Sequence, residues 1–136
     1  MTDKKNLTLL KVALAIFAVA FAIYGVCMLF FTNFYMEMVG GEPINPNWIR
    51  WTGGVLVALA YGAFRVLRNP VKQDVYVSVI ALATLFIGLA LLYELIFELE
   101  SGYFVLFTIL PCAVNLCLSA LIWIGRSQAK EILTQD

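Results

Sequence analysis

The chain has 136 residues and no net formal charge, and 62% of its residues are hydrophobic against 13% charged. Soluble domains carry roughly 45–50% apolar and about 25% charged residues, so this composition excludes an ordinary soluble protein and predicts one compact unit in a lipid bilayer. The balanced charge excludes a nucleic-acid partner, which needs a basic stripe. Histidine is absent and the three cysteines form no C-x-x-C pair, so we expect no metal site and no cofactor.

The first predicted membrane helix covers residues 12–31, a run of twenty residues without a charge. About twenty apolar residues are enough to cross the roughly 30 Å hydrocarbon core of a bilayer. The run is longer than the apolar region of a signal peptide, and no A-x-A-like cleavage site follows it, so we expect a helix that is retained. A short interfacial helix is predicted next, around residues 34–38, followed by a turn-rich segment that contains Gly40, Gly41, Pro43 and Pro46.

The second predicted helix has the weakest signal, because only the fourteen residues 51–64 separate Arg50 from Arg65. A core of this length is also typical of a re-entrant segment. Arginine stems, however, reach the interface while the guanidinium stays in water, so residues 49–67 are long enough to cross. The third and fourth spans are residues 75–93 and 102–125, with 19 and 24 uncharged residues.

Together these runs predict a single domain over residues 1–136, with helices at about 9–33, 47–67, 73–98 and 102–128. Short connections make neighbouring helices antiparallel, so the predicted fold is an all-α, up-down-up-down bundle of four transmembrane helices. The lipid bilayer is then its first partner.

The distribution of charge predicts the orientation of the bundle. Eight of the nine basic residues lie in the two tails or in the connection between the second and third helices: Lys4, Lys5, Lys11, Arg65, Arg68, Lys72, Arg126 and Lys130. The other two connections hold Arg50 and five glutamates. Since Lys and Arg in short loops mark the cytoplasmic side, both termini are predicted to be cytoplasmic. No Arg- and Ser-rich transit peptide is apparent, so a bacterial inner membrane is the expected location.

Arg50, Glu94 and Glu98 form the most notable group of charges. Glu94 and Glu98 are four residues apart, on one face of the third helix near its outer end, and Arg50 lies at a matching depth in the second helix. Ionisable groups at membrane depth are costly and are usually paired. The pattern is typical of an ion pair that holds two helices together; a ligand or ion site at the outer mouth and simple snorkelling are the alternatives.

Two further groups lie within the apolar runs. Gly54, Ala58 and Gly62 recur every four residues, a spacing that lets two helix backbones approach closely, either inside the bundle or between two copies. Pro111 lies in the middle of the fourth helix with Asn115 one turn later. A proline frees a backbone carbonyl and tends to bend a helix, so this pair predicts either a structural kink or a small polar pocket.

Three segments resemble the small bacterial four-helix proteins known as DoxX-like or BphX-like. They are the loop Met36-Glu-Met-Val-Gly-Gly-Glu-Pro43, the helix start Trp48-Ile-Arg-Trp-Thr-Gly-Gly54, and the Arg68-Asn-Pro70 turn before the third helix. The resemblance implies a four-helix membrane fold. It implies no activity and no catalytic residues.

The sequence favours a non-catalytic membrane protein, because it contains no nucleophile–base pair, metal-ligand set or phosphate loop. The predicted role is an accessory or structural subunit of a larger membrane complex, or a self-associating bundle, with other membrane chains or its own copies as partners. The alternative is a small transporter or a protein that binds a lipid, a quinone or another hydrophobic ligand near the outer ends of the second and third helices. An enzyme acting on a lipid-soluble substrate is the least favoured interpretation.

Overall fold

A computed structural model describes residues 2–39, 46–97 and 104–135, without the side chains of residues 2–6 and 104–107. Helices make up this described part, and it contains no strand. Their bounds are α1 Thr2–Phe30, α2 Thr32–Val39, α3 Pro46–Arg68, α4 Asp74–Phe97, α5 Phe104–Gln128 and α6 Lys130–Leu133. The short helix predicted after the first span is present as α2. The turn-rich segment predicted at residues 40–45 and the helix ends predicted at 98 and 102 lie outside the described residues.

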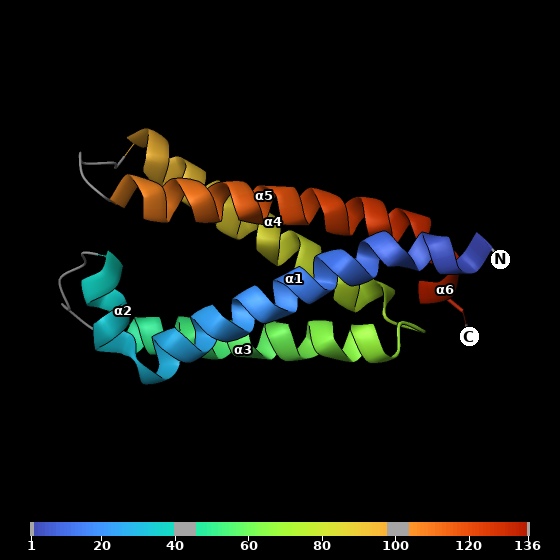
Figure 1. Ribbon diagram of the computed structural model, residues 1–136, viewed down its shortest axis with the longest axis horizontal. Coiled ribbons are helices and arrows are strands. Elements are labelled where there is room, and N and C mark those ends of the chain that lie inside the picture. Colours follow the sequence, from blue (N-terminus) through green and yellow to red (C-terminus); the bar gives the residue numbers. More distant parts are fainter. Residues whose placement is uncertain (1, 40–45, 98–103, 136) are drawn as a thin grey trace.

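The four long helices form two antiparallel pairs (Figure 1). The closest partners are α1 with α3 and α4 with α5, and α1 also packs along α5. In Figure 1 the two pairs converge at the end that holds both termini and diverge toward the opposite end, where α2 lies. We call these the terminal end and the α2 end. Contact between α3 and α4 is slight.

The outer surface of the helices is apolar along their length. The exposed large side chains include Val12, Ile16, Val19, Ile23, Phe30, Val55, Phe64, Phe86, Leu89, Ile109 and Ile124. Contiguous apolar surface of this kind is not stable in water, but it is the normal surface of a helix in lipid. Three segments are long and apolar enough to cross a membrane: Leu7–Phe30, Asp74–Phe97 and Thr108–Gln128. The chain is therefore an integral membrane protein.

Helix α3 is not among those three segments, although its 23 residues extend about 35 Å. Arg50, Arg65 and Arg68 lower its average hydropathy, as do the small and polar residues between them. Length therefore permits α3 to cross the bilayer, whereas composition alone does not establish it.

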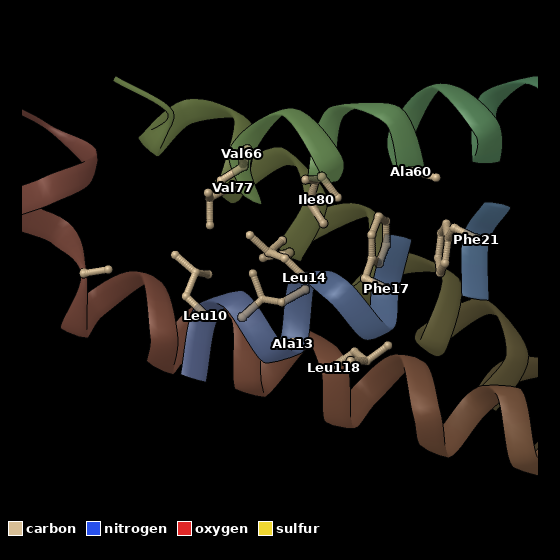
Figure 2. Close-up of a cluster of buried hydrophobic side chains, with 14 of the residues drawn as sticks. Leu10, Ala13, Leu14, Phe17, Phe21, Ala60, Val66, Val77, Ile80 and Leu118 are labelled. Carbon is tan, nitrogen blue, oxygen red and sulfur yellow. The ribbon is translucent and has the colours of Figure 1, made fainter. Parts of the chain in front are cut away.

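The buried core lies in the half of the bundle nearer the terminal end, as the positions of its residues along the helices indicate. Figure 2 shows its side chains. Leu10, Leu14 and Phe17 of α1 are almost fully buried, as are Val77 and Ile80 of α4. Phe17 and Phe21 stack with their ring centroids 3.9 Å apart. Helices α3 and α5 complete the cluster with Leu56, Ala60, Ala63, Val66, Leu118 and Ile122. This half is packed like an ordinary protein interior.

Helices α1 and α3 cross where two glycines face each other. A Cβ atom on Gly53 would lie 2.8 Å from the Gly25 carbonyl oxygen and 2.9 Å from the Leu29 nitrogen. A Cβ on Gly25 would lie 2.9 Å from the Gly53 carbonyl oxygen. The Val57 and Met28 side chains are also in the way, but these backbone atoms cannot move aside as a side chain can. The closest approach of these two helices therefore requires glycine at both positions.

Helices α4 and α5 are joined by hydrogen bonds in the apolar interior. Ser119 Oγ donates to the Ala81 carbonyl oxygen at 2.9 Å, and Cys112 Sγ donates to the Gly88 carbonyl oxygen at 3.4 Å. All three cysteines are free thiols. A buried hydroxyl in lipid must find a partner of this kind, so these contacts fix the register of the pair.

Candidate ligand cavity

A cavity of about 300 Å³ lies in the half of the bundle nearer the α2 end. Every long helix and α2 contribute to its wall. The lining residues are Ala20, Phe21, Tyr24, Met28, Tyr35, Met38, Val39, Thr52, Leu56, Ile87, Leu91, Leu110, Pro111, Val114, Asn115 and Leu118. Two of the lining residues, Phe21 and Leu118, also belong to the buried core (Figure 2).

Most of the wall is hydrocarbon, with few polar side chains: Tyr24, Tyr35, Thr52 and Asn115. An apolar protein cavity of about 150 Å³ stays free of water and accepts benzene. The cavity here has about twice that volume, which suits a ring with a short alkyl chain. A few polar groups in an apolar wall are typical of a small-molecule site.

Asn115 is the most deeply buried polar residue of the wall, with 7% of its surface exposed. Its Nδ2 donates a hydrogen bond to the Pro111 carbonyl oxygen at 2.8 Å. Its Oδ1 is buried and accepts no hydrogen bond from the residues that the structure describes. Helix α5 continues through Pro111 from Phe104 to Gln128. Pro111 and Asn115 thus both line the cavity.

Tyr35 brings a hydroxyl to the cavity from α2. Burial raises the pKa of this phenol above its usual value, because the charged form loses its hydration. Tyr24, Glu94 and Cys27 raise the pKa further through repulsion between like charges. The Tyr35 hydroxyl is therefore neutral at physiological pH and can both donate and accept a hydrogen bond.

Arg50 lies at the α2 end of α3 and is exposed. Its Nε donates a hydrogen bond of 3.3 Å to Thr32 Oγ1, which in turn donates one of 2.7 Å to the Met28 carbonyl oxygen. This chain of contacts ties α3 to the break between α1 and α2. The expected contact with Glu94 is not among the hydrogen bonds and ion pairs of the described residues, because the ends of α3 and α4 lie apart there (Figure 1). Glu98 lies outside the described residues.

The three small residues that recur every four positions in α3, Gly54, Ala58 and Gly62, form a ladder along the helix. They do not all contact the same neighbour. A Cβ on Gly54 would meet no atom of the described residues within 4 Å, and Ala58 is exposed, whereas Gly62 packs against the Tyr76 ring of α4. The glycine of α3 that lies at the close approach to α1 is Gly53, one position before the ladder. One residue is a rotation of about 100° around a helix, so the ladder and the α1 contact lie on different faces.

An ion pair that the sequence did not predict lies at the terminal end. Arg126 Nη2 of α5 contacts Asp74 Oδ2 at the start of α4 at 2.7 Å. Both side chains are about three-quarters buried, with 24% and 23% exposed. The Arg126 guanidinium also lies 5.1 Å from the centroid of the Trp123 ring. Asp74 occupies the first turn of α4, where the helix dipole favours a carboxylate.

No known protein family, curated protein or solved structure matches the chain. Within the described ranges, no three residues of the His, Cys, Asp and Glu types come together as a metal site would need. The cavity has the size and chemistry of a small-molecule binding site.

Proposed function

We propose that this chain is a multi-pass membrane protein that binds one lipid-soluble molecule in the cavity between its two helix pairs. The observation that carries the proposal is the apolar cavity of about 300 Å³ with a buried amide in its wall. Membrane bundles place ligands between helices in this way. We therefore favour a protein that binds a lipid or a quinone, which the sequence offered as the alternative to an accessory subunit.

The cavity is open along part of its wall, so a molecule dissolved in the bilayer has access to it. Its lining is mostly apolar, which favours an apolar occupant over water.

Binding at the cavity is tested by replacing a small lining residue with a large one, so that its side chain occupies the space. Ala20→Phe places a ring inside the wall, and we expect it to weaken binding of 4-hexylanisole at least tenfold, measured by native mass spectrometry of the detergent-solubilised chain. Ala15→Phe is the matched control, because Ala15 is an exposed residue of the same helix and does not line the cavity. Equal binding by both variants would refute the proposed site.

The proposal includes a fourth crossing by α3, with both termini in the cytoplasm of a bacterial inner membrane. Support comes from the close packing of α3 along α1 and from the basic residues Arg65 and Arg68 in its last turn. The Arg68 guanidinium lies 5.8 Å from the centroid of the Phe64 ring, so its stem lies along the helix surface while the charge reaches toward the interface.

Fusion reporters decide the number of crossings. Four spans put the two termini on the same side, whereas three spans put them on opposite sides. We expect green fluorescent protein to fluoresce at either terminus, and alkaline phosphatase to be inactive at both. An active phosphatase at one terminus would show that α3 does not cross.

The accessory-subunit role stays a second proposal. Gly54 and Ala58 leave one face of α3 open, where lipid or a neighbouring membrane chain has access. Ligand binding and assembly use different faces of α3 and are compatible.

A further inference from the structure

We infer that Arg50 binds the phosphate group of a phospholipid at the α2 end, and that one acyl chain of this lipid lies along α3 over Gly54 and Ala58. Arg50 is not among the residues that line the cavity. It precedes the lining residue Thr52 by two positions, a rotation of about 200°, so the two side chains leave α3 on nearly opposite faces. The lipid site is therefore separate from the cavity and does not depend on its occupation.

Exposed aromatic rings mark the α2 end of α3 as a membrane interface. Trp48 and Trp51 flank Arg50 in the sequence, and both are largely exposed. Phe31 and Phe34, just before and within α2, are exposed at the same end of the bundle. Tryptophan rings in membrane proteins are enriched at the boundary between the hydrocarbon and the lipid headgroups. Arg50 therefore lies at the depth of the lipid phosphates.

The Arg50 side chain is exposed, but one of its donors is held in place. Nε donates to Thr32 Oγ1 at 3.3 Å, and the buried Thr32 donates to the Met28 carbonyl oxygen at 2.7 Å. The hydrogen bonds and ion pairs of the described residues include no contact of either Nη group of Arg50. These two groups are therefore available, and their planar arrangement matches two oxygens of one phosphate.

A phosphate is the anion that this position favours. A cation at the edge of the hydrocarbon is costly unless it is paired with an anion. Glu37 of α2 and Glu94 of α4 are the described carboxylates of the α2 end, and neither forms an ion pair with Arg50. Lipid phosphates are the anions that the bilayer itself supplies at this depth.

The face of α3 that continues from Arg50 into the bilayer leaves room for an acyl chain. Gly54 and Ala58 follow Arg50 at intervals of four residues, so they lie on the same side of the helix and extend about 12 Å from it. A Cβ on Gly54 would meet no atom of the described residues within 4 Å, and Ala58 is exposed. Small residues alone also suit a neighbouring helix. A cation at the head of this apolar face favours an amphiphile with a phosphate at one end.

Two lipids that differ in their headgroup test the inference in the delipidated full chain. Dioleoylphosphatidylglycerol and dioleoylglycerol have the same acyl chains, and only the first carries a phosphate. Native mass spectrometry of the detergent-solubilised chain gives a dissociation constant for each. The readout is the ratio of the two constants, compared between variants, because partition of each lipid into the micelle is the same for every variant.

We expect Arg50→Gln to lower the preference for the phosphate lipid by about tenfold, with dioleoylglycerol bound as in wild type. Arg50→Lys keeps the charge without the planar pair of donors and should give an intermediate loss; it replaces the glutamine variant if that variant does not fold. Arg65→Gln is the matched control, because it removes an exposed arginine at the opposite end of α3. It should change the preference by about twofold or less.

An unchanged preference in Arg50→Gln would overturn the phosphate site. An equal loss in Arg65→Gln would also overturn it, because it would show only a general attraction between basic residues and an anionic lipid. Gly54→Leu puts a side chain where the acyl chain lies, so it should weaken binding of the phosphate lipid. Unchanged binding by that variant, or displacement of the lipid by millimolar inorganic phosphate, would overturn the lipid as the ligand.

The cavity variant Ala20→Phe separates this site from the proposed function. It should bind dioleoylphosphatidylglycerol as wild type does, although it loses 4-hexylanisole. Loss of the phosphate lipid in Ala20→Phe would place the lipid in the cavity and overturn the site at Arg50. Retention of 4-hexylanisole in Ala20→Phe would refute the cavity as a binding site and would leave the result for Arg50 unaffected.

Discussion

Replacement of Gly53 by alanine is expected to destabilise the bundle, whereas the same replacement at Gly54 is expected to be neutral or stabilising. The new methyl at position 53 would lie 2.8 Å from the Gly25 carbonyl oxygen, so α1 and α3 would have to separate. Overpacking of this kind costs typically 1–3 kcal/mol. At position 54 nothing lies within 4 Å, and exchange of a helical glycine for alanine gains up to about 1 kcal/mol.

The two variants control for each other, since they make the same chemical change one residue apart in one helix. Their free energies of unfolding should differ by about 1–3 kcal/mol, the cost of overpacking at position 53, because the gain in helix propensity is common to both variants. The measurement is a titration with sodium dodecyl sulfate, followed by circular dichroism in mixed micelles. Equal stabilities would show that α1 and α3 do not cross at Gly25 and Gly53.

Removal of either partner of the Asp74–Arg126 pair is the second large expected effect. Arg126→Met keeps much of the stem but leaves the Asp74 carboxylate three-quarters buried without its cation. Asp74→Asn leaves the Arg126 guanidinium about three-quarters buried without its carboxylate partner. An unpaired, partly buried charge is unfavourable, so we expect each single change to cost about 1–3 kcal/mol of unfolding free energy.

A double-mutant cycle isolates the energy of this pair. The two changes together should cost less than the sum of the single changes by about 1 kcal/mol or more, because the second removes the charge that the first left unpaired. Arg65→Gln, at an exposed arginine of the same end, serves as the control and should change stability by about 0.5 kcal/mol or less. Strict additivity would mean that Asp74 and Arg126 do not interact.

The helices were largely predictable from the sequence, because long uncharged runs define α1, α4 and α5 as apolar segments of membrane length. Helix α3 is different, since Arg50 and Arg65 leave it a short uncharged core. Hydropathy also does not tell which face of a helix meets which neighbour. The ladder at Gly54 had the right spacing for a crossing, but the α1 contact is at Gly53 because α1 presents Gly25 there.

Of the candidate site, the sequence indicates only residues that stand out from an apolar run. Pro111 and Asn115 interrupt such a run and predicted either a kink or a pocket; both of them line the cavity. Arg50 and Glu94 have matching depths, but the divergence of the two helix pairs, which separates the ends of α3 and α4, is a property of packing and leaves no local signal (Figure 1). The same is true of Asp74 and Arg126, which are 52 positions apart.

The central claim is that a lipid-soluble molecule occupies the cavity in the native membrane. Native mass spectrometry of the chain, extracted directly from membranes in a mild detergent, tests it without any added ligand. We predict one small apolar molecule bound to each chain in wild type and in Ala15→Phe, and its loss in Ala20→Phe. A wild-type chain that leaves the membrane with nothing bound, or an Ala20→Phe chain that keeps the same molecule, would contradict the account.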